Sequence, residues 1–200
     1  MQKILETNFP LEELLESISI SHNTNRSFLI AIDGQAGAGK STFTARLVNL
    51  LLDNSIEATI VPLDNFFKTS SQRRQIYAVI SDLDWRRMRD QVILPLRSGK
   101  RAHFQYYSWV EDRLLDWITV ESPSVVIVDG VTALRKELAE FYDLRIWLSC
   151  PDEVRLPRLS SRADMRAGEI KRWLPSERRY LKSHNPASRA DLIIDNSSDS

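Results

Sequence analysis

The chain has 200 residues, of which 42% are hydrophobic and 27% are charged, and its 27 Lys and Arg residues balance 27 Asp and Glu residues. This composition is close to that of an average soluble domain and excludes a wholly disordered chain, a collagen and a coiled-coil rod. Proteins that act on nucleic acid usually carry a basic excess, so the balanced charge argues against a nucleic-acid partner. The single cysteine, Cys150, cannot form an internal disulfide, which excludes an oxidised secreted scaffold.

The N-terminal region and the apolar runs favour a location in the cytoplasm. Residues 1–15 carry Lys3, Glu6, Glu12 and Glu13 among their apolar residues, so they lack the apolar stretch of a signal peptide. No run in the sequence approaches the roughly 18 uncharged apolar residues of a membrane span. We therefore expect a cytoplasmic protein with no membrane partner.

Apolar periodicity predicts alternating helices and strands along the chain. Helical spacing covers residues 11–18, 40–52 and 85–96. Continuous or alternating apolar runs predict strands at residues 28–32, 58–62, 125–128, 144–148 and 192–194. Charged segments between the strands are expected to be helical. Because strands separated by helices need crossover connections, the sequence predicts an α/β fold with about five parallel strands flanked by helices.

The length fits a single domain over residues 1–200. Two charged, weakly periodic stretches, 66–75 and 160–172, are expected to be loops, and we expect the second to form a small lid. Residues 196–200 are expected to be a flexible tail. Trp173, Glu177 and Tyr180 recur at helical spacing and are expected to serve packing.

The most specific motif is a glycine-rich loop. Of the six glycines in the chain, three fall between residues 34 and 39, in a run that fits the pattern G-x-x-x-x-G-K-[ST] between a predicted strand and a predicted helix. Glycines let backbone N–H groups converge on phosphate oxygens, and the helix N-terminus favours the same anion. The residues predicted to bind ATP are Gly34, Gln35, Ala36, Gly37, Ala38, Gly39, Lys40, Ser41 and Thr42. Lys40 would reach the outer phosphates, and the Ser41 hydroxyl would ligate Mg²⁺.

Three aspartates follow predicted strands, at the edge where ligands of parallel sheets bind. Asp129 either faces the magnesium ion or caps the next element. Asp64 is either the carboxylate that takes a proton from an acceptor hydroxyl or a turn residue in Leu63-Asp64-Asn65. Asp33 is expected to brace the backbone of the loop that follows it.

Beyond the loop, several segments resemble the uridine kinase-like branch of P-loop kinases, which also contains phosphoribulokinase and bacterial pantothenate kinase. The segment 62–67, Pro-Leu-Asp-Asn-Phe-Phe, is similar to the family's aspartate followed by aromatic residues, and 126–130 is similar to its strand that ends in an acid and a glycine. Residues 82–85 and 105–109 resemble its two acceptor-binding segments, and 155–166 resembles its arginine-rich lid. The string 31–42 alone also resembles cytidylate kinase.

The resemblance implies a role for single residues. Asp64 matches the proposed base, Asp84 the acid that holds sugar hydroxyls, and Tyr107 the tyrosine of the acceptor pocket. The chain departs from the family pattern at Asn65, Phe67, Ser108, Asp129 and in the Arg162-Ala163-Asp164 stretch, where relatives more often carry Asp, Tyr, Asp, Glu and an adjacent Arg-Asp pair. Trp109, two residues after Tyr107, could stack on a base or belong to the core.

The arginines of the resembling lid recur every three or four residues, at Arg155, Arg158, Arg162 and Arg166. On a helix they would share one face, where they either neutralise charge on the transferred phosphoryl group or form a solvated surface. We take Arg158 and Arg162 as the catalytic pair. No His or Cys cluster with metal-ligand spacing occurs in the sequence.

Together, these features predict an enzyme that transfers the γ-phosphoryl group of ATP to a hydroxyl of a small molecule, with a nucleoside such as uridine as the first choice. A nucleoside monophosphate or a non-nucleoside alcohol stays open as the acceptor, because the pairs Arg73-Arg74 and Arg86-Arg87 could hold a phosphate. A nucleotide-binding regulatory module with little transfer activity is a further alternative. The sequence is silent on the oligomeric state.

Overall fold

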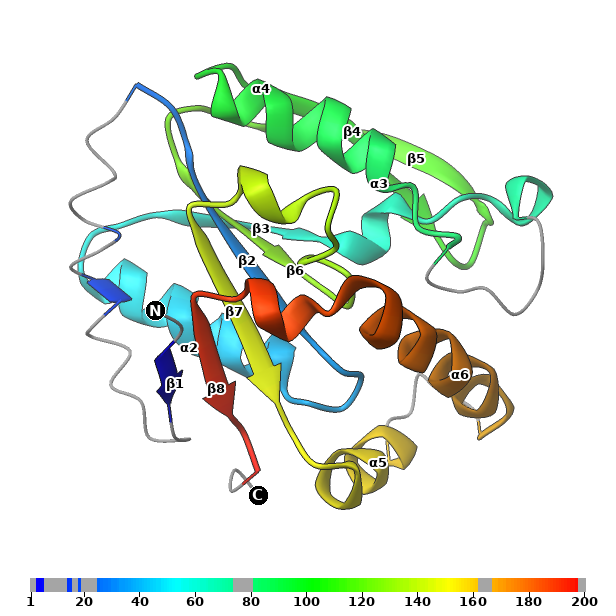
Figure 1. The fold of residues 1–200 in the computed structure, drawn as a ribbon. Coiled ribbons are helices and arrows are strands. Elements are labelled where there is room, and N and C mark those ends of the chain that lie inside the picture. The colour runs from blue at the N-terminus through cyan, green and yellow to red at the C-terminus, as the bar shows by residue number, and fades with distance from the viewer. Residues whose placement is uncertain are drawn as a thin grey trace.

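The fold is built on a six-stranded parallel sheet, as Figure 1 shows. In spatial order the strands are β1 (Lys3–Leu5), β8 (Leu192–Asp195), β7 (Leu144–Ser149), β2 (Phe28–Gly34), β6 (Val125–Asp129) and β3 (Ala58–Pro62). The structure is a computed structural model that describes residues 3–5, 14–15, 18, 25–73, 81–161 and 167–197. It confirms the α/β fold and all five predicted strands. The sixth, β1, has 3 residues, too few for a periodic pattern to reveal it.

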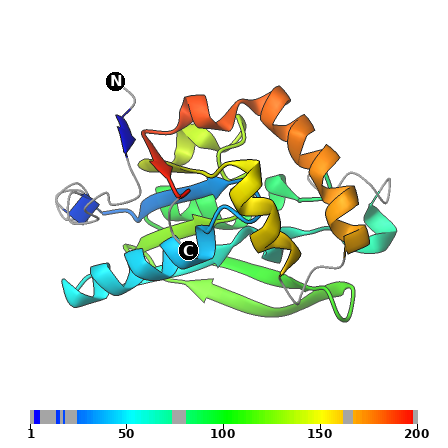
Figure 2. The ribbon, with the colours of Figure 1, turned by 90° about the horizontal axis from the view of Figure 1, so that it is seen from below.

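Helices cover the sheet on both sides. They are α2 (Lys40–Asp53), α5 (Asp152–Ser160), α6 (Ala167–His184) and a continuous helical segment, 85–97, made of α3 (Trp85–Met88), a π-helical turn (Arg89–Ile93) and α4 (Leu94–Arg97). Of the helix predicted at 11–18, only Leu14, Leu15 and Ile18 are described, and they are helical. Helix α5 lies beyond the carboxyl ends of the strands, and α6 runs from that end back beside the sheet toward the start of β8 (Figures 1 and 2).

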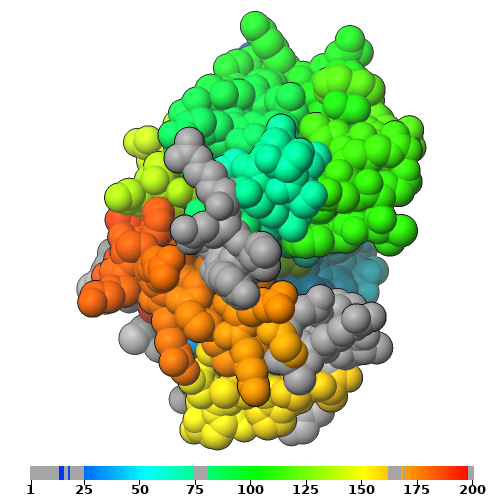
Figure 3. Space-filling view, turned by 90° about the vertical axis from the view of Figure 1, so that its right-hand side faces the viewer, coloured from blue at the N-terminus to red at the C-terminus, as the bar shows by residue number. Residues whose placement is uncertain are grey.

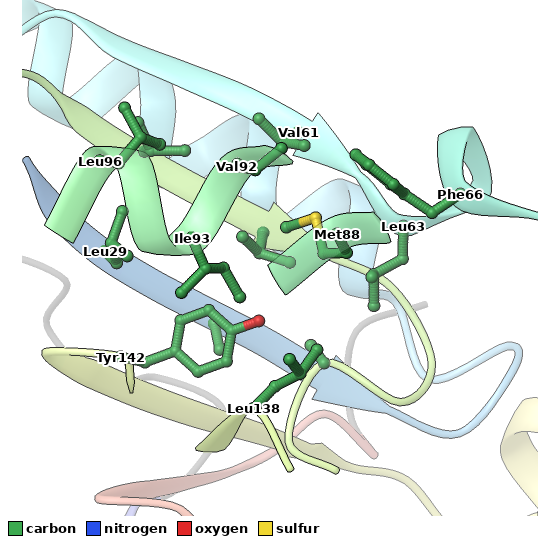
Figure 4. Packing of buried hydrophobic residues seen from close by; sticks show 14 of the residues in the cluster. Leu29, Val61, Leu63, Phe66, Met88, Val92, Ile93, Leu96, Leu138 and Tyr142 are labelled. Carbon is green, nitrogen blue, oxygen red and sulfur yellow. The ribbon is translucent and has the colours of Figure 1, made fainter. Parts of the chain in front are cut away.

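Both faces of the sheet are buried, and side chains alternate between them along each strand. In β2, Leu29 and Ala31 face one core, whereas Ile30 and Ile32 face the other, which α2 covers. The helical segment 85–97 covers the first core. The side chains that it directs toward the sheet are Met88, Val92, Ile93 and Leu96 (Figure 4).

Two expectations about secondary structure are wrong. Between α4 and β6 the chain forms an antiparallel ribbon of β4 (Ala102–Ser108) and β5 (Arg113–Val120) instead of a helix. Its first strand alternates between exposed His103 and buried Ala102 and Phe104, the period of two that a ribbon with one covered face requires. The stretch 160–172 is not a loop throughout, because residues 167–172 begin α6. Residues 162–166 lie outside the described part of the chain.

A carboxylate at the amino-terminal end of the strands ties the sheet to its helical cover. Asp143 accepts hydrogen bonds from Arg26 at 2.8 and 2.9 Å, from Arg97 at 2.8 Å and from the Leu29 N–H at 2.9 Å. Burial alone would raise the pKa of this carboxyl, but the bonds from Arg26 and Leu29 outweigh it, so the pKa lies below its ordinary value of 3.8. In the described parts of the chain, no helix has both the length and the apolar character needed to cross a membrane.

We expect Asp143→Asn to lower the free energy of unfolding at pH 7 by about 1–3 kcal/mol, since charge-assisted bonds to partly exposed arginines are lost. Because the folded pKa is depressed, this stabilisation is present above the ordinary pKa and disappears as the pH falls through the folded value. Urea unfolding at pH 7 and at decreasing acid pH measures both effects. Asp90→Asn, which removes an exposed partner of Arg89, serves as the control and should change stability little. A wild-type advantage over Asp143→Asn that grows as the pH falls would contradict this account.

Candidate active site

The strand register places the three candidate aspartates at one edge of the sheet. Asp129, the last residue of β6, pairs with Pro62 of β3 on one side and with Ile32 of β2 on the other. Asp64 comes two residues after Pro62, and Asp33 directly follows Ile32. Strands that run parallel end at the same edge, so this register gathers residues from distant parts of the sequence.

The glycine loop lies between β2 and α2, at that edge. Gly37 and Gly39 have φ angles of 80° and 88°, in the left-handed region that favours glycine. At both positions a Cβ atom would clash with a neighbour, the Arg155 carbonyl at Gly37 and the Asn196 amide at Gly39. The Lys40 ammonium donates to the carbonyls of Gly34 at 3.0 Å and Gln35 at 3.1 Å. The loop therefore has the backbone that the motif requires.

Four carboxylates act on the Lys40 ammonium. Burial lowers the pKa of Lys40, whereas Asp33, Asp129, Glu177 and Asp64 raise it, in decreasing order of effect. The strand register places Asp64 and Asp129 at the same edge of the sheet as Lys40, and their roles in the reaction stay predictions.

Asp33 has the bracing role that the sequence indicated, and more. Its carboxylate is 0% exposed and accepts bonds from the N–H groups of Gly34 at 2.7 Å, Thr132 at 3.1 Å and Leu134 at 2.9 Å. The Tyr180 hydroxyl donates to it at 2.5 Å. Burial raises the pKa of Asp33, and these hydrogen bonds counter the rise. Asp33 therefore joins the glycine loop to the loop after β6 and to α6.

Asp129 and Ser41 have the chemistry of a magnesium site that a nucleotide completes. Burial raises the pKa of Asp129, whereas Lys40 and the Thr44 hydroxyl lower it. The Thr44 hydroxyl is buried beside Asp129, and no partner in the described part of the chain lies within ordinary hydrogen-bond distance of it. Among the described residues, no three His, Cys, Asp or Glu side chains could hold a metal on their own. Mg²⁺ is commonly bound by one or two carboxylates together with substrate phosphates, and the residues fit this pattern.

Asp64 lies in the short 3-10 helix Leu63–Phe66, directly after β3. Leu63 and Phe66 are buried and anchor this turn, while Asp64 is exposed. Its charge also raises the pKa of Asp129, which places the two carboxylates within electrostatic reach of each other. Asp64 is therefore an exposed carboxylate at the ligand edge of the sheet, in a turn that two buried side chains hold in place.

Asp84 caps the helical segment 85–97, since its side chain accepts from the Arg87 N–H at 3.2 Å. Arg87 in turn donates to the carbonyls of Gln105 at 2.6 Å and Asn65 at 2.7 Å, and its guanidinium lies 4.6 Å from the centre of the Phe66 ring. One arginine thus connects the three segments that carry Asp64, Asp84 and Tyr107.

Tyr107 belongs to an aromatic cluster with Phe67 and Trp109. Their ring centres lie 4.7 Å apart for Phe67–Trp109 and 5.1 Å apart for Tyr107–Trp109, and the Arg73 guanidinium lies over all three rings. The Tyr107 hydroxyl accepts from Arg73 and donates to Asp112, both at 2.7 Å. Trp109 is 54% exposed, so of the two alternatives left open for it, a place in the core is excluded.

The two described lid arginines, both on α5, contact different segments. Arg155 is buried, and its guanidinium donates to the Ala36 carbonyl of the glycine loop at 2.9 Å. Arg158 donates to the Asn196 carbonyl at 3.1 Å, at the end of β8. Arg162 and Arg166 lie outside the described residues, so the proposed role of Arg162 stays a prediction, as does that of Arg158.

Sequence reasoning missed two residues that contact the glycine loop. Glu177, expected to serve packing only, accepts from the Ala36 N–H at 2.6 Å. Asn196, expected in a flexible tail, is buried and donates to the Ala38 carbonyl at 2.9 Å. The available signal for Asn196 was a polar residue directly after a predicted strand, and the signal for Glu177 was an acid at helical spacing with Trp173 and Tyr180. Figure 3 views the face where α5, α6 and the β4–β5 ribbon reach the surface.

Comparisons with known proteins agree with this architecture. The model of the phosphoribulokinase / uridine kinase family matches residues 29–195. A uridine kinase from Ureaplasma parvum serovar 3 is 28% identical over 146 residues, which cover 68% of this chain and 70% of that protein. Uridine-cytidine kinase A from Dictyostelium discoideum is 28% identical over 142 residues, 68% of this chain and 28% of that longer protein.

Solved structures share the fold. The structure of a possible uridine kinase from Bacillus stearothermophilus has a TM-score of 0.67 at 22% identity and covers 92% of this chain and all of that one. A D-glycerate 3-kinase from Cryptococcus neoformans has a TM-score of 0.58 at 11% identity, over 93% of this chain and 95% of that one. With its glycine loop, its strand-end acids and this match over most of its length, the chain belongs to the phosphoribulokinase / uridine kinase family and is an ATP-dependent P-loop kinase.

Proposed function

We propose that the protein transfers the γ-phosphoryl group of ATP·Mg²⁺ to a hydroxyl group of a nucleoside. The observation that carries this proposal is the position of Asp64, an exposed carboxylate at the ligand edge of the sheet that acts electrostatically on both Lys40 and Asp129. A kinase that phosphorylates a hydroxyl needs such a group, whereas one that phosphorylates a phosphate does not. Because ATP is the donor, we place the reaction in the cytoplasm.

The chain's own residues divide the work of phosphoryl transfer. The N–H groups of the loop and the Lys40 ammonium hold the phosphates, and Asp64 orients the acceptor hydroxyl and accepts its proton as the oxygen attacks. Ser41 and Asp129 would hold Mg²⁺, which neutralises charge on the phosphates when bound. Arg158 and Arg162 are proposed to stabilise the charge on the transferred group.

The arginines favour a neutral acceptor over a monophosphate. Arg87 is bound to two backbone carbonyls, and Arg73 donates to the Lys68 carbonyl and the Tyr107 hydroxyl. Arg86 lies over the Trp85 ring, with its guanidinium 4.4 Å from the ring centre. A phosphate in the acceptor site would have to compete with these contacts, so the described arginines of the Arg73-Arg74 and Arg86-Arg87 pairs give a phosphate little support.

The aromatic cluster favours a planar group on the acceptor. Phe67, Tyr107 and Trp109 already surround one planar group, the Arg73 guanidinium, and a nucleobase has the same preference for aromatic faces. Asp84, on the neighbouring helix cap, would then meet the sugar hydroxyls. The relatives named uridine kinase and uridine-cytidine kinase support the same class of acceptor.

The first test is Asp64→Asn, which keeps the shape and removes the charge and the basicity. Single-turnover transfer to a nucleoside should fall by about two to four orders of magnitude, the usual scale for a positioned acid–base group, while ATP affinity barely changes. Lys40→Ala should instead weaken both ATP binding and transfer. Asp116→Asn, an exposed acid on β5, is the matched control. Near-normal transfer by Asp64→Asn would overturn the hydroxyl-kinase mechanism and favour a phosphate acceptor or a regulatory role.

The second test concerns the metal. Asp129→Asn should raise the Mg²⁺ concentration for half-maximal transfer by about tenfold or more, since even partners of a metal ligand typically contribute that much. Burial raises the pKa of Asp129, so its proton competes with the ion at a higher pH than for an ordinary aspartate. The wild type should therefore require more Mg²⁺ as the pH is lowered, and the variant should lose this dependence. An unchanged Mg²⁺ requirement in Asp129→Asn would exclude Asp129 as a ligand.

The third test separates a nucleoside from an open-chain alcohol. Trp109→Ala should raise the KM for uridine by about five- to a hundredfold, the range expected when base stacking is lost, and leave slow ATP hydrolysis in the absence of acceptor unchanged. Trp117→Ala is a matched control, because Trp117 is also 54% exposed but stacks on His103 on the ribbon. Efficient transfer to glycerate, with no transfer to any nucleoside, would point to a non-nucleoside alcohol.

A further inference from the structure

Two oppositely charged side chains that the proposed reaction does not use lie buried against the glycine loop. The side chain of Arg155, on α5, is 2% exposed, and that of Glu177, on α6, is 0% exposed. Arg155 Nη1 and Glu177 Oε2 are 3.0 Å apart. A buried ion pair is a weak source of stability, because the cost of desolvation offsets the attraction between the charges. Stability alone therefore does not explain why the Arg155–Glu177 pair lies against the glycine loop.

Both members of the pair hold the same residue of the loop. Glu177 Oε1 accepts from the Ala36 N–H at 2.6 Å, and Arg155 Nη1 donates to the Ala36 carbonyl at 2.9 Å. Each charged group is itself fixed by a further partner. Arg155 Nε donates to Asp152 at 2.7 Å, and Trp173 Nε1 donates to Glu177 Oε1 at 3.3 Å. Side chains from α5 and α6 thus bind the carbonyl and the N–H group of the same loop residue, Ala36.

The pair also acts on the charge of the phosphate site. Glu177 is one of the carboxylates that raise the pKa of Lys40, so its charge reaches the ammonium group expected to bind the outer phosphates. Arg155 carries the opposite charge at 3.0 Å from Glu177 and therefore opposes this field. Removing either charge should therefore change the affinity of the loop for phosphate. Loss of the Glu177 charge should raise this affinity, and loss of the Arg155 charge should lower it.

We propose that Arg155 and Glu177 are positioning residues for the nucleotide: together they orient the peptide groups of Ala36, and by neutralising each other they set the charge that the bound phosphates meet. This inference rests on the proposed use of the loop for ATP and does not depend on the identity of the acceptor.

The test measures ATP and ADP affinity by calorimetry and transfer by single turnover. Glu177→Gln removes the buried negative charge and leaves Arg155 paired only with the half-exposed Asp152, so it should tighten nucleotide binding about three- to tenfold. Arg155→Met leaves the Glu177 charge without its cationic partner and should weaken binding by a similar factor. Both variants should transfer more slowly than the wild type, because Ala36 is no longer held from both sides. A purely structural role would shift the two affinities in the same direction.

The double variant Arg155→Met/Glu177→Gln keeps the test decisive if a single variant does not fold. It carries no unpaired charge, so its nucleotide affinity should return to within about twofold of the wild type while its transfer rate stays at least about tenfold lower. Arg155→Lys keeps the positive charge but lacks the planar guanidinium. Compared with Arg155→Met, it should have a nucleotide affinity close to that of the wild type but an equally slow transfer rate. Arg145→Met, which breaks an ion pair with Asp191 at the other end of β7, controls for loss of an ion pair and should change neither.

Two results would overturn the inference. One is a shift of nucleotide affinity in the same direction for both single variants, and the other is a wild-type transfer rate in the double variant. Failure of the wild type itself to bind ATP would instead overturn the proposed function, so the two failures can be told apart.

Discussion

The fully buried carboxylate of Asp33 accepts hydrogen bonds from Gly34, Thr132, Leu134 and Tyr180, which lie in three segments far apart in the sequence. A charged group without water needs such partners, because leaving it unpaired would cost several kcal/mol. The requirement works in both directions, since each partner is held in place by the same carboxylate. The glycine loop, the loop after β6 and helix α6 therefore take their mutual positions from Asp33, and the contacts of α6 with the glycine loop follow from that placement.

Patterns within short segments of the sequence predicted most of the fold and the glycine loop at the centre of the site. The apolar runs of β2 and β6 and the glycine pattern at 34–42 are signals within one short segment, and the structure places both where the sequence predicted. The ribbon of β4 and β5 was missed because Arg113 to Val120 alternates too weakly in polarity to separate a strand from a charged helix. Asn196 and Glu177 were misread because their partners, Ala38 and Ala36, lie more than a hundred residues away.

The acceptor end of the site depends on a different kind of contact. Asp64, Asp84 and Tyr107 come from three segments, and a single guanidinium, that of Arg87, bonds to backbone carbonyls in two of them and follows the helix cap in the third. Backbone carbonyls are available at every residue, so no sequence pattern could reveal which ones Arg87 would choose. The same contacts hold Arg87, which in sequence could bind a phosphate together with Arg86, against the protein backbone, in line with the neutral acceptor that we propose.

Charge connects the two ends of the site. Four carboxylates act on Lys40, and among the described residues Lys40 and Arg155, which is shared between Glu177 and Asp152, offset only part of their negative charge. A triphosphate would add to this excess, so an acidic site of this kind should bind ATP poorly on its own. One divalent cation at Asp129 and Ser41 would balance the excess. On the proposed function, the acids that surround the loop would thus make nucleotide binding depend on the metal, because the loop and these carboxylates act on the same phosphates.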